Sequence, residues 1–131
     1  MKPIYDGKTK RVHDNGKTLI LEFKDTILGH KDGTPEPGGN FVVGRSLGKS
    51  RVATATSVRI FQLLEKARVK THFLRKVDPT KIEVIKTQPI PLEVIYRRLA
   101  SGSFLRRYRG RVKPFAKLDL IEFTLKDDSL G

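Results

Sequence analysis

The sequence predicts an α+β fold in which a mostly antiparallel sheet packs on one main helix. Two observations support this class: several short segments alternate apolar and polar residues, and one longer segment spaces its apolar residues as a helix does. The chain has 131 residues, with no internal repeat or low-complexity tract, and this length suits a single core. We therefore expect one domain over residues 1–131.

The first predicted elements are a hairpin and a long loop. Residues 17–23, KTLILEF, alternate as a strand does, with two leucines and a phenylalanine on one face. The segment before this strand is its predicted hairpin partner, with Asn15-Gly16 as the turn dipeptide. Residues 25–50 hold six of the eleven glycines and two prolines, so we expect this stretch to be largely loop.

The only helix predicted from apolar spacing covers residues 50–67, with Ser50 as its N-cap. Ser57 is a polar mismatch on its apolar face, whose expected members are Val52, Ile60, Phe61, Leu64 and Ala67.

Four more strands are predicted after this helix. Their ranges are 70–77, 81–87, 92–98 and 119–126, with a turn at Asp78-Pro79 between the first two. In the last strand Ile121, Phe123 and Leu125 fall on one side, and Glu122, Thr124 and Lys126 fall on the other.

Composition narrows the function classes. Absence of cysteine excludes disulfides, thiolate metal sites and thiol catalysis, and the three histidines show no recognisable metal-ligand spacing. No apolar run is long enough to cross a bilayer, and the start is too polar for a secretory signal, so we expect a cytoplasmic protein that does not contact membranes. The net charge of +13 predicts anionic partners, either a nucleic acid or phosphorylated small molecules.

Two stretches in the first half have features of phosphate sites. Gly7 lies between predicted strands and lets the backbone approach a ligand, with Lys8 and Lys10 beside it, although the pattern alone is more typical of a basic β-turn. Gly48-Lys49-Ser50 opens the predicted helix, where free N–H groups, the helix dipole and a lysine favour an anion.

The loop that precedes this helix allows two interpretations. It is either a binding loop, in which Asp25 and Asp32 orient amines or a hydrated cation, or a disordered surface loop.

A third stretch, PLEVIYRRLASGSFLRRYRGRVKP, combines a strand with a dense run of cations over residues 91–114. Arg97 and Ser103 flank a Ser-Gly-Ser turn that begins a predicted short helix, an arrangement suited to one phosphate. The later arginines, Arg106, Arg107, Arg109 and Arg111, are typical of a basic rim. Only Tyr108 is interleaved among them, so stacking on RNA bases has little support.

Taken together, these stretches resemble the SAICAR synthetase family of purine biosynthesis. YDGKTKRVH is similar to the family's Y-x-G-K-x-K opening, and LEFKDTILGHKDG to its L-x-F-K-D-x-x-T-A-x-x-G stretch. GKS followed by IFQLLEKARVKTHFL resembles the family's glycine-lysine helix start and its LL-E-x-x-G-I-x-T-H-F segment. PIPLEVIYRRLASGSFLRRY is similar to I-P-L-E-V-V-V-R-N-x-A-A-G-S-x-x-R-R, and FTLKDDSLG to the K-N/D-D element.

The resemblance implies an ATP-grasp-like domain and an ATP-dependent ligase that uses Mg²⁺. Such an enzyme joins the carboxylate of carboxyaminoimidazole ribotide to L-aspartate, through an acyl phosphate, and releases ADP and phosphate. It implies ATP contacts at Gly7, Lys8, Thr9, Lys10 and Lys86. It implies substrate contacts at Arg97, Ser103, Asp32, Gly48 and Lys49. The resemblance assigns no catalytic residue and no metal ligand to residues 1–131. It also makes nucleic acid an unlikely partner.

The chain also departs from the family pattern. Arg98 and Leu99 stand where an asparagine and a variable residue are common, Ser101 replaces the second alanine, and Ser50 stands where glycine is frequent. Residues 32–47 form a longer loop than usual, and the sequence ends at Gly131, before the Asp-Phe-Lys-x-Glu and Asp-Glu-x-Ser-Pro-Asp elements.

From these departures we expect the N-terminal half of such an enzyme, as a fragment or as a natural short form. We expect that it cannot complete catalysis alone, and that it forms a homo-oligomer or binds a complementing C-terminal chain. The alternatives are a basic RNA-binding module and a non-catalytic nucleotide-binding fragment.

Overall fold

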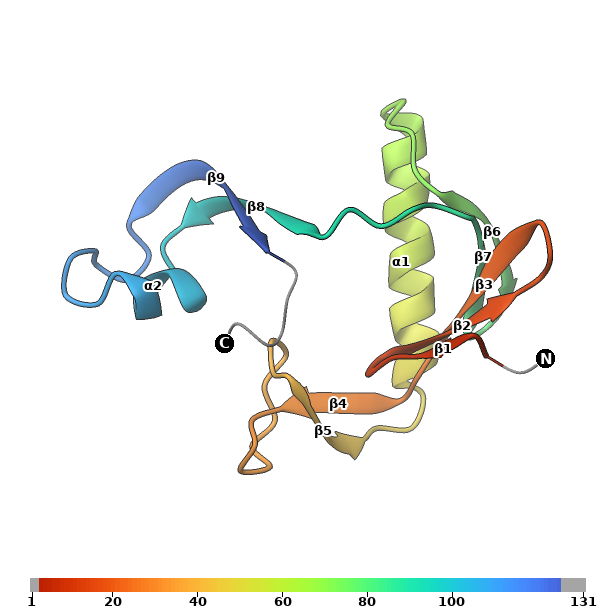
Figure 1. The fold of residues 1–131 in the computed structure, drawn as a ribbon, viewed down its shortest axis with the longest axis horizontal. Coiled ribbons are helices and arrows are strands. Elements are labelled where there is room, and N and C mark those ends of the chain that lie inside the picture. Colours follow the sequence, from red (N-terminus) through yellow and green to blue (C-terminus); the bar gives the residue numbers. More distant parts are fainter. Residues whose placement is uncertain (1–2, 126–131) are drawn as a thin grey trace. The chain divides into compact units, whose positions relative to one another are not determined.

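The computed structural model describes residues 3–125, which form nine strands and two helices: five strands precede the first helix, three lie between the helices, and one follows the second (Figure 1). These elements confirm the predicted α+β class, and every strand pairing between them is antiparallel. The chain divides into two compact units at Thr87–Gln88, and each unit is described by itself. Within the described residues, no helix has the length and apolar character needed to cross a bilayer.

The first unit is built on a five-stranded sheet in the order β1-β2-β3-β7-β6. Its strands are β1 (Tyr5–Asp6), β2 (Lys10–Asp14), β3 (Thr18–Phe23), β6 (Phe73–Asp78) and β7 (Lys81–Ile85). The β2–β3 hairpin turns at Asn15-Gly16 as predicted: the N–H of Asn15 donates to Thr18 O at 3.0 Å, and Gly16 has φ +85°. β6 starts three residues later and ends one residue later than predicted, and β7 ends two residues earlier than predicted.

Helix α1 (Lys49–Lys66) packs on one face of this sheet (Figure 1). The buried core contains Phe23, Ile82 and Val84, and Phe61 of α1 packs against it with its ring stacked on Phe73 at 5.0 Å between centroids. The helix starts earlier than predicted. Its N-cap is Gly48, with φ +85°, so the prediction of Ser50 as N-cap is wrong.

The predicted apolar face of α1 is also partly wrong. Val52 and Ile60 are more than half exposed, whereas Ser57 lies on the inward side with Thr54, which is fully buried. Small residues at the start of the inward face let the helix lie close to the sheet. The hydroxyl of Thr54 remains satisfied there because it donates to Ser50 O at 2.8 Å.

The glycine-rich stretch before α1 is more ordered than the predicted loop. It contains an antiparallel pair, β4 (Thr26–Gly29) and β5 (Phe41–Arg45), with a bulge after Ile27. Here glycine serves backbone packing: a Cβ on Gly39 would lie 2.1 Å from the carbonyl oxygen of Gly29. The prediction from glycine content missed these two strands, because glycine ordinarily weakens a strand.

The second unit holds β8 (Leu92–Leu99), α2 (Ser103–Arg107) and β9 (Lys117–Leu125). The two strands form an antiparallel pair with a register irregularity between Arg97 and Leu99. The predicted short helix at Ser103 is confirmed. The buried apolar residues described in this unit are Ala100 and Phe104, a small core for three elements.

Candidate functional site

The loop between β1 and β2, residues 7–9, is held by its carbonyl groups. Gly7 O accepts from Lys24 Nζ at 2.9 Å, Lys8 O from Thr26 Oγ1 at 2.6 Å, and Thr9 O from the N–H of Lys24 at 2.9 Å. In a trans peptide the N–H points opposite to the carbonyl. The N–H groups that follow these carbonyls therefore point away from the segment at residues 24–26.

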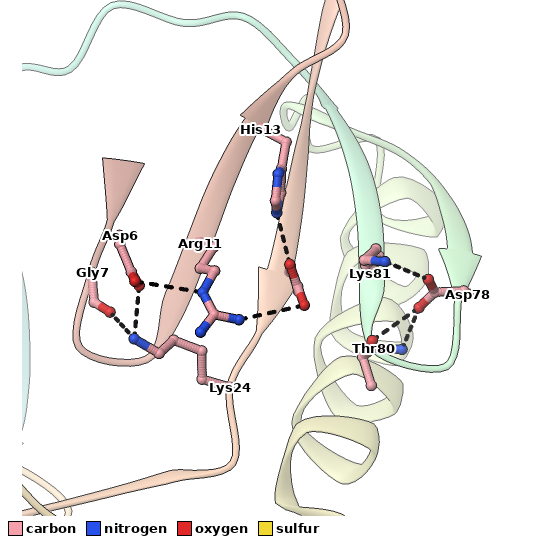
Figure 2. Close-up of polar contacts among 9 residues, drawn as sticks. Asp6, Gly7, Arg11, His13, Lys24, Asp78, Thr80 and Lys81 are labelled. Carbon is pink, nitrogen blue, oxygen red and sulfur yellow. Dashed lines mark hydrogen bonds and ion pairs between the residues drawn. The ribbon is translucent and has the colours of Figure 1, made fainter. Parts of the chain in front are cut away.

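Ion pairs fasten the same loop to the sheet (Figure 2). Lys24 Nζ also donates to Asp6 at 2.7 Å, and Arg11 lies between Asp6 and Glu22. The hydrogen bond from Lys24 holds the pKa of Asp6 below its ordinary value of 3.8. At the loop's start, a Cβ on Gly7 would lie 2.9 Å from the ring of Tyr5 and 3.2 Å from Lys10 O, so a larger residue would have to displace the exposed Tyr5 side chain.

Two lysines from distant parts of the sequence approach each other beside this loop. Burial, and next the positive charge of Lys49, lower the pKa of Lys10 from its ordinary value of 10.5. Lys49 Nζ donates to Thr26 O at 2.7 Å, at the start of α1. Two close ammonium groups, one of them partly desolvated, attract an anion because it relieves their repulsion.

A pocket of about 320 Å³ opens beside these lysines. Thr9 and Lys49 line it, and its other lining residues, mostly apolar, are Ile27, Leu28, Pro35, Glu36 and Pro37. This volume is within the usual range for small-molecule sites. The structure thus brings Thr9 of the first predicted stretch together with Lys49 of the second.

The start of α1 lacks the free N–H groups that the sequence predicted. Asp25 accepts the N–H of Ser50 at 2.8 Å, and the N–H groups of Lys49, Arg51 and Val52 donate to backbone carbonyls of residues 46 and 48. Hydrogen bonds from the backbone and then the hydroxyl of Ser50 lower the pKa of Asp25 from 3.8. A carboxylate of the chain itself therefore caps this helix, so an anion here would have to rely on lysine side chains.

Two predicted site residues lie elsewhere in the first unit. Lys86 follows β7 and pairs with Asp14 at 2.8 Å, at the opposite end of β2 from Lys10. Asp32 lies in the connection between β4 and β5, where it accepts the N–H of Thr34 at 2.9 Å. Neither lines the pocket beside Thr9 and Lys49.

In the second unit, Arg97 and Ser103 lie together as the sequence predicted. Arg97 Nη2 donates to Ser103 Oγ at 2.9 Å, and Arg97 Nη1 to Ser101 O at 3.4 Å. Arg97 Nε donates to one carboxylate oxygen of Glu122 on β9, and Arg107 donates to the other. The hydrogen bond from Arg97 is the main cause that lowers the pKa of Glu122 from 4.5. Sequence reasoning missed Glu122, because only the β8–β9 register places it beside Arg97.

A carboxylate that bridges two arginines sets their orientation. The side chains of Arg97 and Glu122 are only 12% and 15% exposed, whereas Arg107 is 42% exposed. Arg97 also lies over the ring of Phe104, at 5.8 Å from its centroid. Among the described residues, no group of three or more His, Cys, Asp or Glu side chains comes together as a metal site would require.

Comparison with known proteins places these features in a family. The sequence model of SAICAR synthetase matches residues 3–131, nearly the whole chain. The chain belongs to the SAICAR synthetase family. A phosphoribosylaminoimidazole-succinocarboxamide synthase from Akkermansia muciniphila is 40% identical over 133 residues, which are 100% of this chain and 53% of that protein.

Solved SAICAR synthetase structures share this fold. The enzyme from Ehrlichia chaffeensis is 28% identical with a TM-score of 0.82, over 98% of this chain and 52% of its own. A SAICAR synthetase solved in complex with ADP is 32% identical with a TM-score of 0.79, over 96% of this chain and 51% of its own. The chain therefore spans about half the length of the SAICAR synthetases it matches. The family's K-N/D-D element corresponds to Lys126–Asp128, outside the described residues.

Proposed function

We propose that this chain is the nucleotide- and ribotide-binding half of an ATP-dependent ligase of purine biosynthesis. The reaction joins the carboxylate of carboxyaminoimidazole ribotide to L-aspartate and gives SAICAR, ADP and phosphate. The observation that carries the proposal is the convergence of Thr9 and Lys49 at one pocket, with Lys10 close enough to Lys49 to feel its charge, within a chain of the SAICAR synthetase family. The first unit would be ATP-grasp-like, with the 7–9 loop contacting the ATP phosphates.

ATP phosphates would lie against Gly7, Lys8, Thr9 and Lys10. The loop's carbonyls are bound to residues 24–26, so the N–H groups that follow them point to the opposite side, the orientation a phosphate needs, whereas the Gly7 N–H donates to Lys10 O at 2.9 Å. A phosphate would also favour the charged form of Lys10, which burial and Lys49 oppose in its absence. Lys86, at the other end of β2, would lie on the adenine side. The relative solved with ADP supports nucleotide use.

The ribotide 5′-phosphate would be held by Arg97 and Ser103. Their hydrogen bond already places a guanidinium edge and a hydroxyl side by side. Gly48, Lys49 and Asp32 would line the substrate side, with Lys49 as the cation. Glu122 would act as a positioning residue, because it fixes Arg97 through Nε, and each Nη, which donates one N–H to Ser101 or Ser103, would offer its second N–H to the phosphate.

The chemical steps depend on aligning the ribotide carboxylate with the γ-phosphate of ATP, and they do not require a nucleophilic side chain of the protein. The ribotide carboxylate oxygen bonds to the γ-phosphorus as the bond to ADP breaks, and the aspartate amine then attacks the acyl carbon and expels phosphate. The lysines neutralise charge that builds on the phosphoryl oxygens. Mg²⁺ would accompany the nucleotide phosphates, and residues 3–125 gather no set of carboxylates that would form a site for it without the nucleotide.

This chain matches only 53% of the Akkermansia muciniphila relative, which motivates a proposal about its partner. We propose a single domain-like half that works in the cytoplasm with a complementing polypeptide, with or without a homo-oligomer. The complementary polypeptide used below is the part of the Akkermansia muciniphila relative outside the segment that this chain matches.

The test is ADP release from ATP, Mg²⁺, aspartate and the ribotide, with and without the complementary polypeptide. We expect release only when both polypeptides are present. Absence of ADP binding by this chain, combined with tight and salt-sensitive RNA binding, would refute the ligase and favour the RNA-binding module.

Two arginine variants test the ribotide site in the complemented mixture. Arg97→Ala should weaken ribotide binding at least tenfold, because hydrogen bonds to a charged group contribute about 1.5–3 kcal/mol. Arg109→Ala, a matched change in the basic rim, should alter it less than threefold. Circular dichroism checks that both variants fold, and equal affinities of the two would show that the assigned phosphate site is wrong.

A further inference from the structure

Lys24, which directly follows β3, holds the 7–9 loop through both its backbone and its side chain (Figure 2). Its N–H donates to Thr9 O at 2.9 Å, and its Nζ donates to Gly7 O at 2.9 Å and to Asp6 at 2.7 Å. The side chain of Lys24 is only 18% exposed. Two of the three N–H bonds of this ammonium group are therefore directed to acceptors within the protein.

The hydrogen bond to Gly7 O departs from the usual pattern of a hairpin. Gly7 and Lys10 lie opposite each other at the β1–β2 turn, where the N–H of Gly7 donates to Lys10 O at 2.9 Å. In an antiparallel pair of this type the two residues ordinarily exchange both hydrogen bonds, so the N–H of Lys10 would donate to Gly7 O. Between these two described residues that second bond is not formed, and Lys24 Nζ donates to Gly7 O instead.

The ammonium group of Lys24 thus takes the place of a backbone amide and releases the N–H of Lys10 from the turn. A backbone N–H that the fold does not pair needs water or a ligand as its acceptor. A phosphate oxygen is a suitable acceptor, because successive N–H groups of a turn form anion-binding sites. The side chain of Lys10 favours the same ligand, since burial and next Lys49 lower its pKa and a nearby anion opposes both effects.

We propose that Lys24 is a positioning residue for the nucleotide: it satisfies Gly7 O and so keeps the N–H of Lys10 available to the ATP phosphates. This inference rests on the proposed function and deepens it, because Lys24 acts through the loop and does not itself touch the phosphates. Asp6 has a part in this role. Its carboxylate pairs with the Lys24 ammonium, so the phosphates are attracted to the lysines of the loop and not to Lys24.

The first experiment compares ADP binding by Lys24→Met and Lys81→Met in the 131-residue chain, measured by titration calorimetry. Methionine approximates the length of the lysine stem but cannot donate a hydrogen bond. Lys81 is the matched control, because it pairs with a carboxylate of the same sheet, Asp78 at 3.2 Å, and lies outside the loop (Figure 2). Lys24→Met should bind ADP at least about tenfold more weakly, and Lys81→Met should stay within about twofold of the unsubstituted chain.

Hydrogen exchange of the Lys10 amide, followed by NMR without nucleotide, tests the mechanism directly. In the unsubstituted chain this N–H lacks Gly7 O as an acceptor and should exchange rapidly. In Lys24→Met the released Gly7 O should accept the Lys10 N–H and slow its exchange by at least about fivefold. A merely structural role of Lys24 predicts the opposite sign, because a loosened loop exchanges its amides faster. Lys81→Met should leave the rate unchanged.

A second variant covers a failure of Lys24→Met to fold, which circular dichroism would detect. Asp6→Asn keeps Lys24 but removes the charge that holds its ammonium group, and the Asp6 side chain is half exposed, so the chain should fold normally. ADP affinity should fall by about threefold in this variant, because an ion pair at the surface contributes less than a buried one.

Three results would overturn the role of Lys24 while ADP binds the unsubstituted chain normally. The first is an ADP affinity of Lys24→Met equal to that of Lys81→Met. The second is an unchanged or faster exchange of the Lys10 amide in Lys24→Met, since an unchanged rate would make Lys24 a direct phosphate contact. The third is an unchanged ADP affinity of Asp6→Asn. Absence of ADP binding by the unsubstituted chain would instead refute the proposed function, and the nucleotide role of Lys24 with it.

Discussion

Lys10 carries a charge that the ligand-free fold disfavours. Its pKa is lowered, chiefly by burial and then by Lys49, so the unfolded chain binds this proton more tightly than the folded one. Protonated Lys10 therefore opposes folding at neutral pH, and this effect is lost as the pH rises toward the ordinary value of 10.5. A residue that weakens folding in this way is explained if an anion binds beside it.

Replacement of Lys10 by methionine should separate these two effects. Lys10→Met keeps a contact with the ring of Phe23, over which the lysine lies at 4.9 Å, while it removes the charge. We expect a higher Tm without ligand and at least tenfold weaker ADP binding, measured by scanning and titration calorimetry. Lys17→Met, at an exposed turn, is the control, and unchanged ADP affinity in Lys10→Met would refute the phosphate role.

Arg68 adopts a backbone conformation that suits glycine. It follows α1 with φ +58°, where its N–H donates to Glu65 O and ends the helix. The family pattern LL-E-x-x-G has glycine at this position, whereas this chain has arginine. A left-handed conformation costs a non-glycine residue about 1–2 kcal/mol.

Arg68→Gly should therefore stabilise the chain. The expected gain in free energy of unfolding is up to about 1 kcal/mol, because the added flexibility of the unfolded chain offsets part of the strain relieved. Arg59→Gly, inside the same helix, should instead lose about 1 kcal/mol. Urea denaturation of both variants measures the difference, and destabilisation by Arg68→Gly would contradict this account.

At the scale of elements, helix α1 is anchored by a residue outside it. Asp25, just before β4, accepts the Ser50 N–H and so joins the helix start to the glycine-rich segment. Its lowered pKa means that the ionised carboxylate stabilises the folded state. This contribution is complete above the unfolded value of about 3.8 and is lost as the pH falls through the lower folded value.

The Asp25→Asn variant should show this dependence directly. An amide can still accept the Ser50 N–H but lacks the charge that interacts with the helix N-terminus. We expect a Tm several degrees lower than that of the unsubstituted chain at pH 7, and a difference that narrows as the pH falls below 3.8. A Tm difference that stays constant at every pH at which the chain remains folded would mean that ionisation of Asp25 does not contribute.

Element prediction succeeded where local pattern is sufficient. The β2–β3 hairpin followed from alternation and an Asn-Gly turn, and helix α1 followed from apolar spacing. The β4–β5 pair was missed because its glycines are needed for contact between Gly29 and Gly39, which are not neighbours in sequence. The helix N-cap was misplaced because Asp25, and not the local serine, satisfies the first turn.

At the scale of the molecule, the apolar core described in the first unit is small and central. Ile82 is 1% exposed between Phe23 and Val84, whereas Ile85 on the same strand is 47% exposed. Ile82→Ala should lower the free energy of unfolding by about 2–5 kcal/mol, and Ile85→Ala should have a much smaller effect. Hydrogen exchange of β3 and β7 amides measures both losses. Equal losses would show that the core is not centred on Ile82.

The sequence by itself determined the α+β class, the main helix, the hairpin and the family, because alternation, helical spacing and ordered motifs are local properties. It also paired Arg97 with Ser103, which are six residues apart and separated by one turn. Only the tertiary structure decided that Glu122 orients Arg97, that Asp25 caps α1, and that Lys10 lies near Lys49. These contacts join residues 25 to 39 positions apart, and their formation depends on strand register and chain crossing, which periodicity within one segment does not encode.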